Sequence, residues 1–99
     1  MNTNEEDPIT TNFPPSWLGG WESVNGNSDI YIFQGVDGNY YLLACSYDKE
    51  SERGCFSCYE IEQDEEGCYI RKGIKYVRLL PEEKPYGLHI SGWGSYMKT

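Results

Sequence analysis

The chain has 99 residues, of which 38% are hydrophobic and 15% aromatic, and its 16 acidic and 8 basic residues give a formal net charge of −8. This length predicts one domain with one core and excludes a large internal cavity, so any ligand pocket should be small or shallow. No apolar run approaches the roughly 20 residues of a membrane-spanning helix, and the polar start lacks the apolar stretch of a secretory signal. We therefore expect a cytoplasmic protein with no membrane partner, and the acidic charge argues against nucleic acid as a partner.

Residues 1–16 combine acidic residues, Asn, Thr and three prolines with few apolar side chains. Such a segment cannot offset the entropy lost on ordering, so we expect a polar, flexible N-terminal tail. Residues 17–99 are rich in aromatic and β-branched residues with regularly spaced glycines, which predicts a single β-domain. Any helix should be a single turn, at residues 14–17 or in the loop that starts at Asp48.

Two-residue alternation bounded by turn residues predicts strands through this domain. The predicted strands span residues 20–24, 29–34, 39–47, 55–63, 68–72, 74–80 and 88–93. The fifth and sixth are either separate or one strand with a bulge at Gly73. Six or seven short antiparallel strands predict an all-β meander that forms a small barrel or a strongly curled sheet, with little or no helix.

Charge is unevenly distributed along the chain. Acidic residues gather between Asp48 and Glu66, and a basic strip follows them, formed by Arg71, Lys72, Lys75 and Arg78. Opposite charges on neighbouring strands attract, so we expect the strip to face the acidic strand before it. The alternative is a strip that contacts an anionic partner.

The four cysteines, Cys45, Cys55, Cys58 and Cys68, have the spacing C-x9-C-x2-C-x9-C. Only the central pair has the spacing of a zinc knuckle, and no helix lies nearby to lower a thiol pKa as in a redox motif. We therefore expect free, buried or half-buried thiols and no cofactor. A zinc site or thiol-redox module built from these four cysteines is the alternative.

Aromatic side chains are the most informative part of the composition, with 3 Trp, 9 Tyr and 3 Phe. Most of the tyrosines lie in predicted strands, so both faces of the sheet carry rings. They either pack the core and shield the outer surface, or form a row for partner binding or self-association. The candidate binding residues are Trp17, Trp21, Tyr41, Tyr47 and Trp93.

Motifs for catalysis are absent from the sequence, which has no P-loop, no H-E-x-x-H and no G-x-S-x-G. The single histidine, His89, alternates with apolar neighbours and is expected to form hydrogen bonds at the surface. The paired carboxylates, such as Glu60 and Glu62, lie in predicted strands and turns open to water, which does not raise one pKa above the other. We predict that the protein is not an enzyme.

The sequence Gly19-x-Trp21 before the first predicted strand resembles the opening motif of the lipocalins and their small bacterial lipocalin-like relatives. The resemblance implies that Gly19 lets the chain turn beneath a barrel and that Trp21 closes its floor. It also implies a basic residue packed over that tryptophan. The residues after Arg78 that could take this role are Lys84, Lys98 and His89. Such a barrel would bind a small apolar ligand between its inner face and the end that holds Trp17 and Trp21.

A second resemblance rests on residues 17–21, the pair of tyrosines in residues 39–42, and residues 86–90. Together they resemble a family of small uncharacterised proteins from gut anaerobes, often found with mobile or conjugative elements. This family implies no catalytic or binding residue. The sequence therefore favours a non-catalytic protein-interaction module, with the lipocalin-like binder and the cysteine-based module as alternatives.

Overall fold

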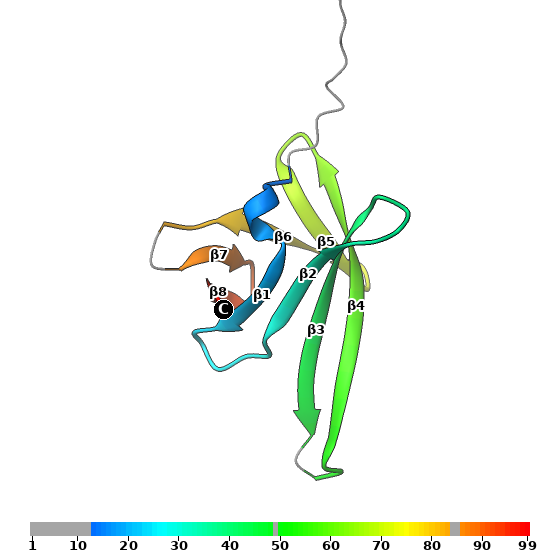
Figure 1. Cartoon of the computed structure of the whole chain (residues 1–99), viewed down its shortest axis with the longest axis vertical. Coiled ribbons are helices and arrows are strands. Elements are labelled where there is room, and N and C mark those ends of the chain that lie inside the picture. Colours follow the sequence, from blue (N-terminus) through cyan, green and yellow to red (C-terminus); the bar gives the residue numbers. More distant parts are fainter. Residues whose placement is uncertain (1–12, 49, 84–85) are drawn as a thin grey trace, which may run out of the picture.

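Every strand pairs with its neighbour in the sequence, and the last pairs with the first, so the sheet closes into an antiparallel barrel (Figure 1). The structure is a computed structural model that describes residues 13–48, 50–83 and 86–99, without the side chains of Tyr47 and Asp48. The strands are β1 (Gly19–Ser23), β2 (Ile30–Gln34), β3 (Tyr40–Asp48), β4 (Arg53–Asp64), β5 (Gly67–Lys72), β6 (Lys75–Pro81), β7 (Gly87–Ile90) and β8 (Gly94–Lys98). A 3-10 helix, η2 (Pro15–Trp17), precedes β1. The predicted all-β fold with almost no helix is confirmed.

The described residues form eight strands, because the structure differs from the prediction at two strand boundaries. Gly73 has a φ of 66° and lies in the turn between β5 and β6, so these are separate strands and not one bulged strand. The predicted strand 88–93 is wrong at its end. Gly92 and Gly94, with φ values of 81° and 112°, turn the chain there, and β8 follows. Glycine suits these positions because other residues rarely adopt a positive φ.

The barrel interior is filled by aliphatic side chains that alternate with outward-facing residues along each strand. Six fully buried side chains are Ile32, Leu42, Ile70, Leu88, Ile90 and Tyr96. They come from β2, β3, β5, β7 and β8, so the core is contributed by strands from the whole chain. This packing leaves the middle of the barrel occupied by side chains.

One end of the barrel is closed by aromatic residues from the N-terminal part of the domain. Phe13 stacks on Tyr40 at 3.9 Å between ring centroids and meets Trp17 edge to face at 5.8 Å. The indole N–H of Trp21 donates a hydrogen bond of 2.9 Å to the carbonyl oxygen of Trp17. Of the predicted tail, the structure describes residues 13–16, of which Phe13 is buried at this end and Pro15 and Ser16 are exposed. Residues 1–12 lie outside the described part.

The C-terminal strand completes this closed end. The ammonium of Lys98 lies 4.8 Å from the ring centroid of Trp21 and donates hydrogen bonds of 2.5 Å to the carbonyl oxygens of Ser16 and Leu18. On another side of the same ring, Gly87 has a φ of 128°, and a Cβ there would lie 3.2 Å from a Trp21 ring carbon. Trp21 is thus enclosed by three separate segments of the chain.

The opposite end of the barrel is where the β1–β2 loop and the β7–β8 turn lie. β3 and β4 form the longest pair, from Tyr40 opposite Ile61 to Asp48 opposite Arg53, and this hairpin extends beyond the other strands (Figure 1). Both surfaces considered below lie on or next to this hairpin. Within residues 13–48, 50–83 and 86–99, no helix is long and apolar enough to cross a membrane.

Candidate binding surfaces

Three neighbouring strands carry apolar side chains on their outer surface as well as inside. Ile32 on β2, Leu42 on β3 and Ile61 on β4 are buried in the core, so the alternating residues between them point outward. We call these outward residues the aromatic face. It consists of Tyr31, Phe33, Tyr41, Leu43, Cys45, Phe56 and Cys58.

The strand register joins these residues into one continuous patch. Phe33 is opposite Tyr41, and Tyr31 is opposite Leu43, which is in turn opposite Cys58. Cys45, farther along β3, is opposite Phe56. The ring centroids of Tyr31 and Phe33 are 6.2 Å apart and those of Phe33 and Tyr41 are 5.6 Å apart. Tyr31 is 50% exposed and Phe56 69%, so the patch faces solvent.

Carboxylates border the aromatic face. Glu60 lies opposite Tyr41 across the β3–β4 pair. The hydroxyl of Tyr41 donates a 2.5 Å hydrogen bond to Asp37, and this bond lowers the pKa of the Asp37 carboxyl. None of the seven residues of the face is basic. The surface is therefore an apolar patch with an acidic border.

Two of the four residues of the predicted basic strip, Arg71 and Arg78, pair with carboxylates of β4 and of the turn after it, as the charge pattern predicted. Arg78 forms two hydrogen bonds with Asp64, of 2.7 and 2.8 Å, and lies 3.2 Å from a carboxylate oxygen of Glu66. Arg71 lies 3.1 Å from Glu62. The hydrogen bonds from Arg78 lower the pKa of Asp64 to about 2. Both guanidinium groups are thus engaged by carboxylates on the outside of the barrel.

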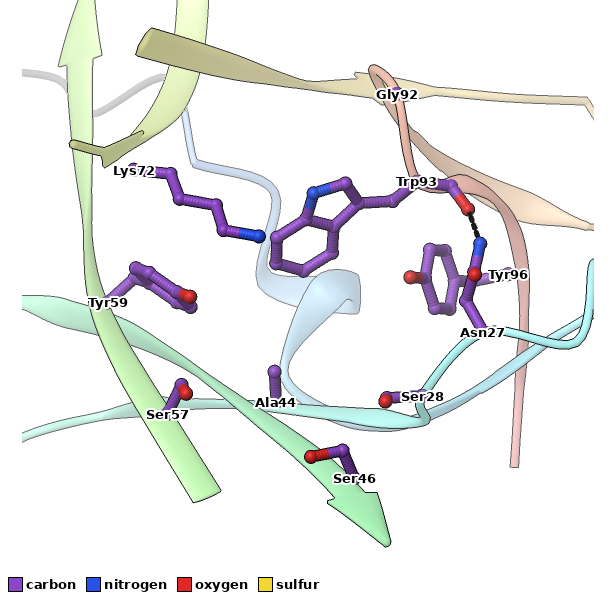
Figure 2. A pocket seen from close by; sticks show the side chains of 10 residues that line it. All are labelled: Asn27, Ser28, Ala44, Ser46, Ser57, Tyr59, Lys72, Gly92, Trp93 and Tyr96. Carbon is purple, nitrogen blue, oxygen red and sulfur yellow. Dashed lines mark hydrogen bonds between the residues drawn. The ribbon is translucent and has the colours of Figure 1, made fainter. Parts of the chain in front are cut away.

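The open end of the barrel holds a second surface, a pocket of about 290 Å³ (Figure 2). It is formed by the β1–β2 loop, β3, β4, the end of β5, the β7–β8 turn and β8. The lining residues are Asn27, Ser28, Ala44, Ser46, Ser57, Tyr59, Lys72, Gly92, Trp93 and Tyr96. Lys72 is the only charged residue among them.

Trp93 projects across this pocket from the β7–β8 turn (Figure 2). Its ring centroid lies 5.7 Å from the ammonium of Lys72 and 6.0 Å from the Tyr59 ring, which meets it at 67°. The side-chain amide of Asn27 donates a hydrogen bond to the carbonyl oxygen of Trp93. This bond ties the β1–β2 loop to the turn that carries the indole.

Tyr96 forms the inner wall of the pocket. Its side chain is fully buried, and its hydroxyl oxygen has no hydrogen-bond partner among the described residues. Burial raises the pKa of Tyr96, and the nearby charge of Asp29 acts in the same direction. The hydroxyl therefore keeps its proton at neutral pH and is an unused hydrogen-bond donor.

The structure separates the five candidate binding residues into three places. Trp17 and Trp21 are 5% and 4% exposed and belong to the closed end, whereas Trp93 lines the pocket at the opposite end. Tyr41 lies on the aromatic face. The backbone of Tyr47 continues β3, and its side chain lies outside the described part.

Sequence reasoning missed the remaining residues of both surfaces. For the aromatic face a signal was present, because residues 30–33 and 40–45 are continuous apolar runs and not alternating ones. For the pocket there was no local signal. Lys72 stood within the basic strip, and nothing near Tyr96 in the sequence set it apart from other tyrosines.

The four cysteines are free and do not converge. Cys68 is buried in the core, which raises the pKa of its thiol, whereas Cys45 and Cys58 lie on the aromatic face. Cys55, near the tip of the β3–β4 hairpin, and Cys58 are exposed, so the expectation of buried or half-buried thiols is wrong for these two. No three His, Cys, Asp or Glu residues in the described ranges are grouped so that they could hold a metal ion.

Comparison of the chain with family models, with curated proteins and with solved structures found no match.

Among possible catalytic groups, His89 lies 3.3 Å from the hydroxyl of Ser95, its cross-strand neighbour. The functional argument therefore rests on the aromatic face and the pocket.

Proposed function

We propose that this protein is a non-catalytic interaction module that binds a partner protein through the aromatic face. The observation that supports this proposal is the outward position of seven adjoining apolar side chains on β2, β3 and β4 of a closed barrel. Contiguous apolar patches on a solvent-facing surface are typical of protein–protein interfaces, where Tyr and Phe are enriched.

The acidic border specifies the chemistry of the partner. Asp37 and Glu60 would face whatever covers the patch, so a matching surface has an apolar centre flanked by Lys or Arg. A second copy of this chain would bring carboxylates against carboxylates, and each copy carries a net charge of −8. We therefore propose a basic protein partner and a monomeric chain in its absence.

Affinity capture from a lysate of the source cells tests this proposal with a matched pair of variants. The variant Tyr31→Ser/Phe56→Ser removes two exposed rings from the aromatic face. The control Val36→Ser/Ile74→Ser removes two apolar side chains that are 111% and 97% exposed, in turns outside the face. Wild type and control should retain the same stoichiometric partner, rich in Lys and Arg, and the face variant should lose it.

Salt and sedimentation complete the experiment. Capture should weaken as salt is raised, because the charges of the acidic border are screened. Equal capture by the face variant and wild type would overturn the proposal. So would sedimentation of the isolated chain as a dimer that the face variant dissociates, because the occupant would then be a second copy.

The lipocalin-like alternative places a small apolar ligand against Trp17 and Trp21. The contact of Lys98 with Trp21 has the form that this resemblance implies for the floor of the barrel. That same contact encloses the ring, and Trp17 is also buried. The burial of Trp17 and Trp21 therefore favours a structural role for both at the closed end. A lipocalin-like ligand would have to bind at the open end instead.

A further inference from the structure

We propose that the pocket at the open end of the barrel is a second binding site, for a small free aromatic carboxylate. This site does not rest on the aromatic face, because none of its lining residues belongs to that face. The inference combines three features of the pocket: a lysine ammonium without a carboxylate partner and a buried hydroxyl without a hydrogen-bond partner, both among the described residues, and an indole ring that crosses the opening (Figure 2).

Lys72 supplies the positive charge. Successive residues of β5 point to opposite sides, so Arg71 lies outside near Glu62 while Lys72 turns toward the pocket. The described residues place no carboxylate within ion-pair distance of the Lys72 ammonium, and none of the ten lining residues is acidic. A bound carboxylate would provide the missing counter-ion through a charge-assisted hydrogen bond.

The Tyr96 hydroxyl supplies a neutral donor. A buried polar group without a hydrogen bond costs free energy, and the great majority of such groups in folded proteins have a partner. Tyr96 lines the pocket, but its hydroxyl oxygen is itself buried, so a ligand oxygen accepts from it only where the pocket side chains in front of it move aside.

The rings of Trp93 and Tyr59 favour an aromatic body for the ligand. Aromatic pairs prefer offset-stacked or edge-to-face contacts, and the Trp93 ring already has the Lys72 ammonium at 5.7 Å and the Tyr59 ring at 6.0 Å from its centroid. The volume of about 290 Å³ is at the lower end of the range for small-molecule sites, which limits the ligand to about one ring and a short substituent.

The overall acidity of the chain suggests an alternative ligand, an organic cation held by the aromatic rings. The ammonium of Lys72 already lies over Trp93 and would repel such a cation. Charge therefore distinguishes the two ligand classes, and three compounds of similar shape can be compared: benzoate, benzamide and benzylamine.

The first experiment titrates each compound into the whole protein at neutral pH and follows amide and indole N–H signals by NMR. Benzoate should bind at least about tenfold more tightly than benzamide, and benzylamine should bind most weakly. The indole signal of Trp93 should shift, whereas those of Trp17 and Trp21, buried at the other end, should stay in place.

The second experiment compares variants. Lys72→Met should lower the affinity for benzoate to that for benzamide, whereas Lys75→Met should leave it unchanged. Lys75 is opposite Lys72 in the sheet but does not line the pocket, so this control removes the same overall charge. Tyr96→Phe should weaken benzoate binding by about three- to tenfold without loss of thermal stability, because the hydroxyl it removes has no described partner.

Four outcomes would overturn this inference: no benzoate binding, equal affinity for benzamide or benzylamine, a shift of the Trp21 indole instead of Trp93, or equal losses in the two lysine variants. The Tyr31→Ser/Phe56→Ser protein should bind benzoate like wild type. Failure of the partner experiment therefore leaves the pocket inference standing, and failure of the titration leaves the partner proposal standing.

Discussion

The Lys98 ammonium caps the ring of Trp21 at 4.8 Å from its centroid and binds the carbonyl oxygens of Ser16 and Leu18 at the same time. One side chain from the last strand thereby joins the first strand to the helical turn that precedes it. These carbonyl groups lie where η2 ends and β1 begins, and the ammonium satisfies both of them. The closure of the barrel therefore depends on contacts between the two ends of the domain.

The variant Lys98→Met tests this closure. It keeps a long apolar side chain over Trp21 but removes the ammonium, so the cation–π contact and two charge-assisted hydrogen bonds are lost. We expect the free energy of unfolding to fall by roughly 1–3 kcal/mol, measured by urea denaturation. Lys75→Met removes an exposed lysine from another end of the barrel and should change stability by less than about 0.5 kcal/mol. Equal effects of the two variants would show that the cap does not stabilise the fold.

Gly87 tests the packing on the other side of the same ring. A Cβ at Gly87 would lie 3.2 and 3.3 Å from two Trp21 ring carbons, and φ is 128°. Gly67 has nearly the same φ, 130°, with no atom within 4 Å of a Cβ, so Gly67→Ala carries the backbone strain alone. We expect Gly87→Ala to be less stable than Gly67→Ala by about 1 kcal/mol or more in thermal or urea unfolding. Equal losses would mean that Trp21 moves aside without cost.

The fold was predictable from sequence because most strands show two-residue alternation of side chains between turn residues. The exception was the C-terminal hairpin. Alternation appeared to continue from Leu88 to Trp93, and the segment after it has only Tyr96 and Met97 as large apolar side chains. The turn depends on the positive φ of Gly92 and Gly94, and β8 is stabilised by pairing with β1, which is far away in the sequence.

The two binding surfaces differ in how far sequence could predict them. Tyr41 was identified because tyrosines are abundant in the strands, although which of them face outward depends on how the barrel closes. The pocket joins Lys72 to Trp93 only because β5 and the β7–β8 turn reach the same end. In the sequence, Lys72 is one of four neighbouring basic residues and does not stand out. In the structure, the pleat of β5 points Lys72 inward and Arg71 outward.

The pairing of Arg78 with Asp64 predicts a pH dependence of stability. The folded pKa of Asp64 is about 2, below the usual 3.8, so its contribution is fully present above about pH 4 and is lost as pH falls toward 2. Asp64→Asn should flatten the decrease in stability between pH 4 and pH 2, measured by urea unfolding at each pH. Glu65→Gln removes a carboxylate from the same turn and should keep the wild-type slope. A slope that Asp64→Asn leaves unchanged would contradict this assignment.

The thiols can be tested by their rates of reaction with Ellman's reagent under native conditions. Cys55 and Cys58 are exposed and should react first, Cys45 is half-buried and should react more slowly, and Cys68 should react last. Burial both hinders access to Cys68 and raises its thiol pKa, so little reactive thiolate is present. Single Cys→Ser variants assign each rate, and the denatured protein should show all four thiols. Fewer than four thiols after denaturation without reductant would reveal a disulfide, and slow reaction of Cys55 and Cys58, made fast by a chelator, would support the zinc alternative over free thiols.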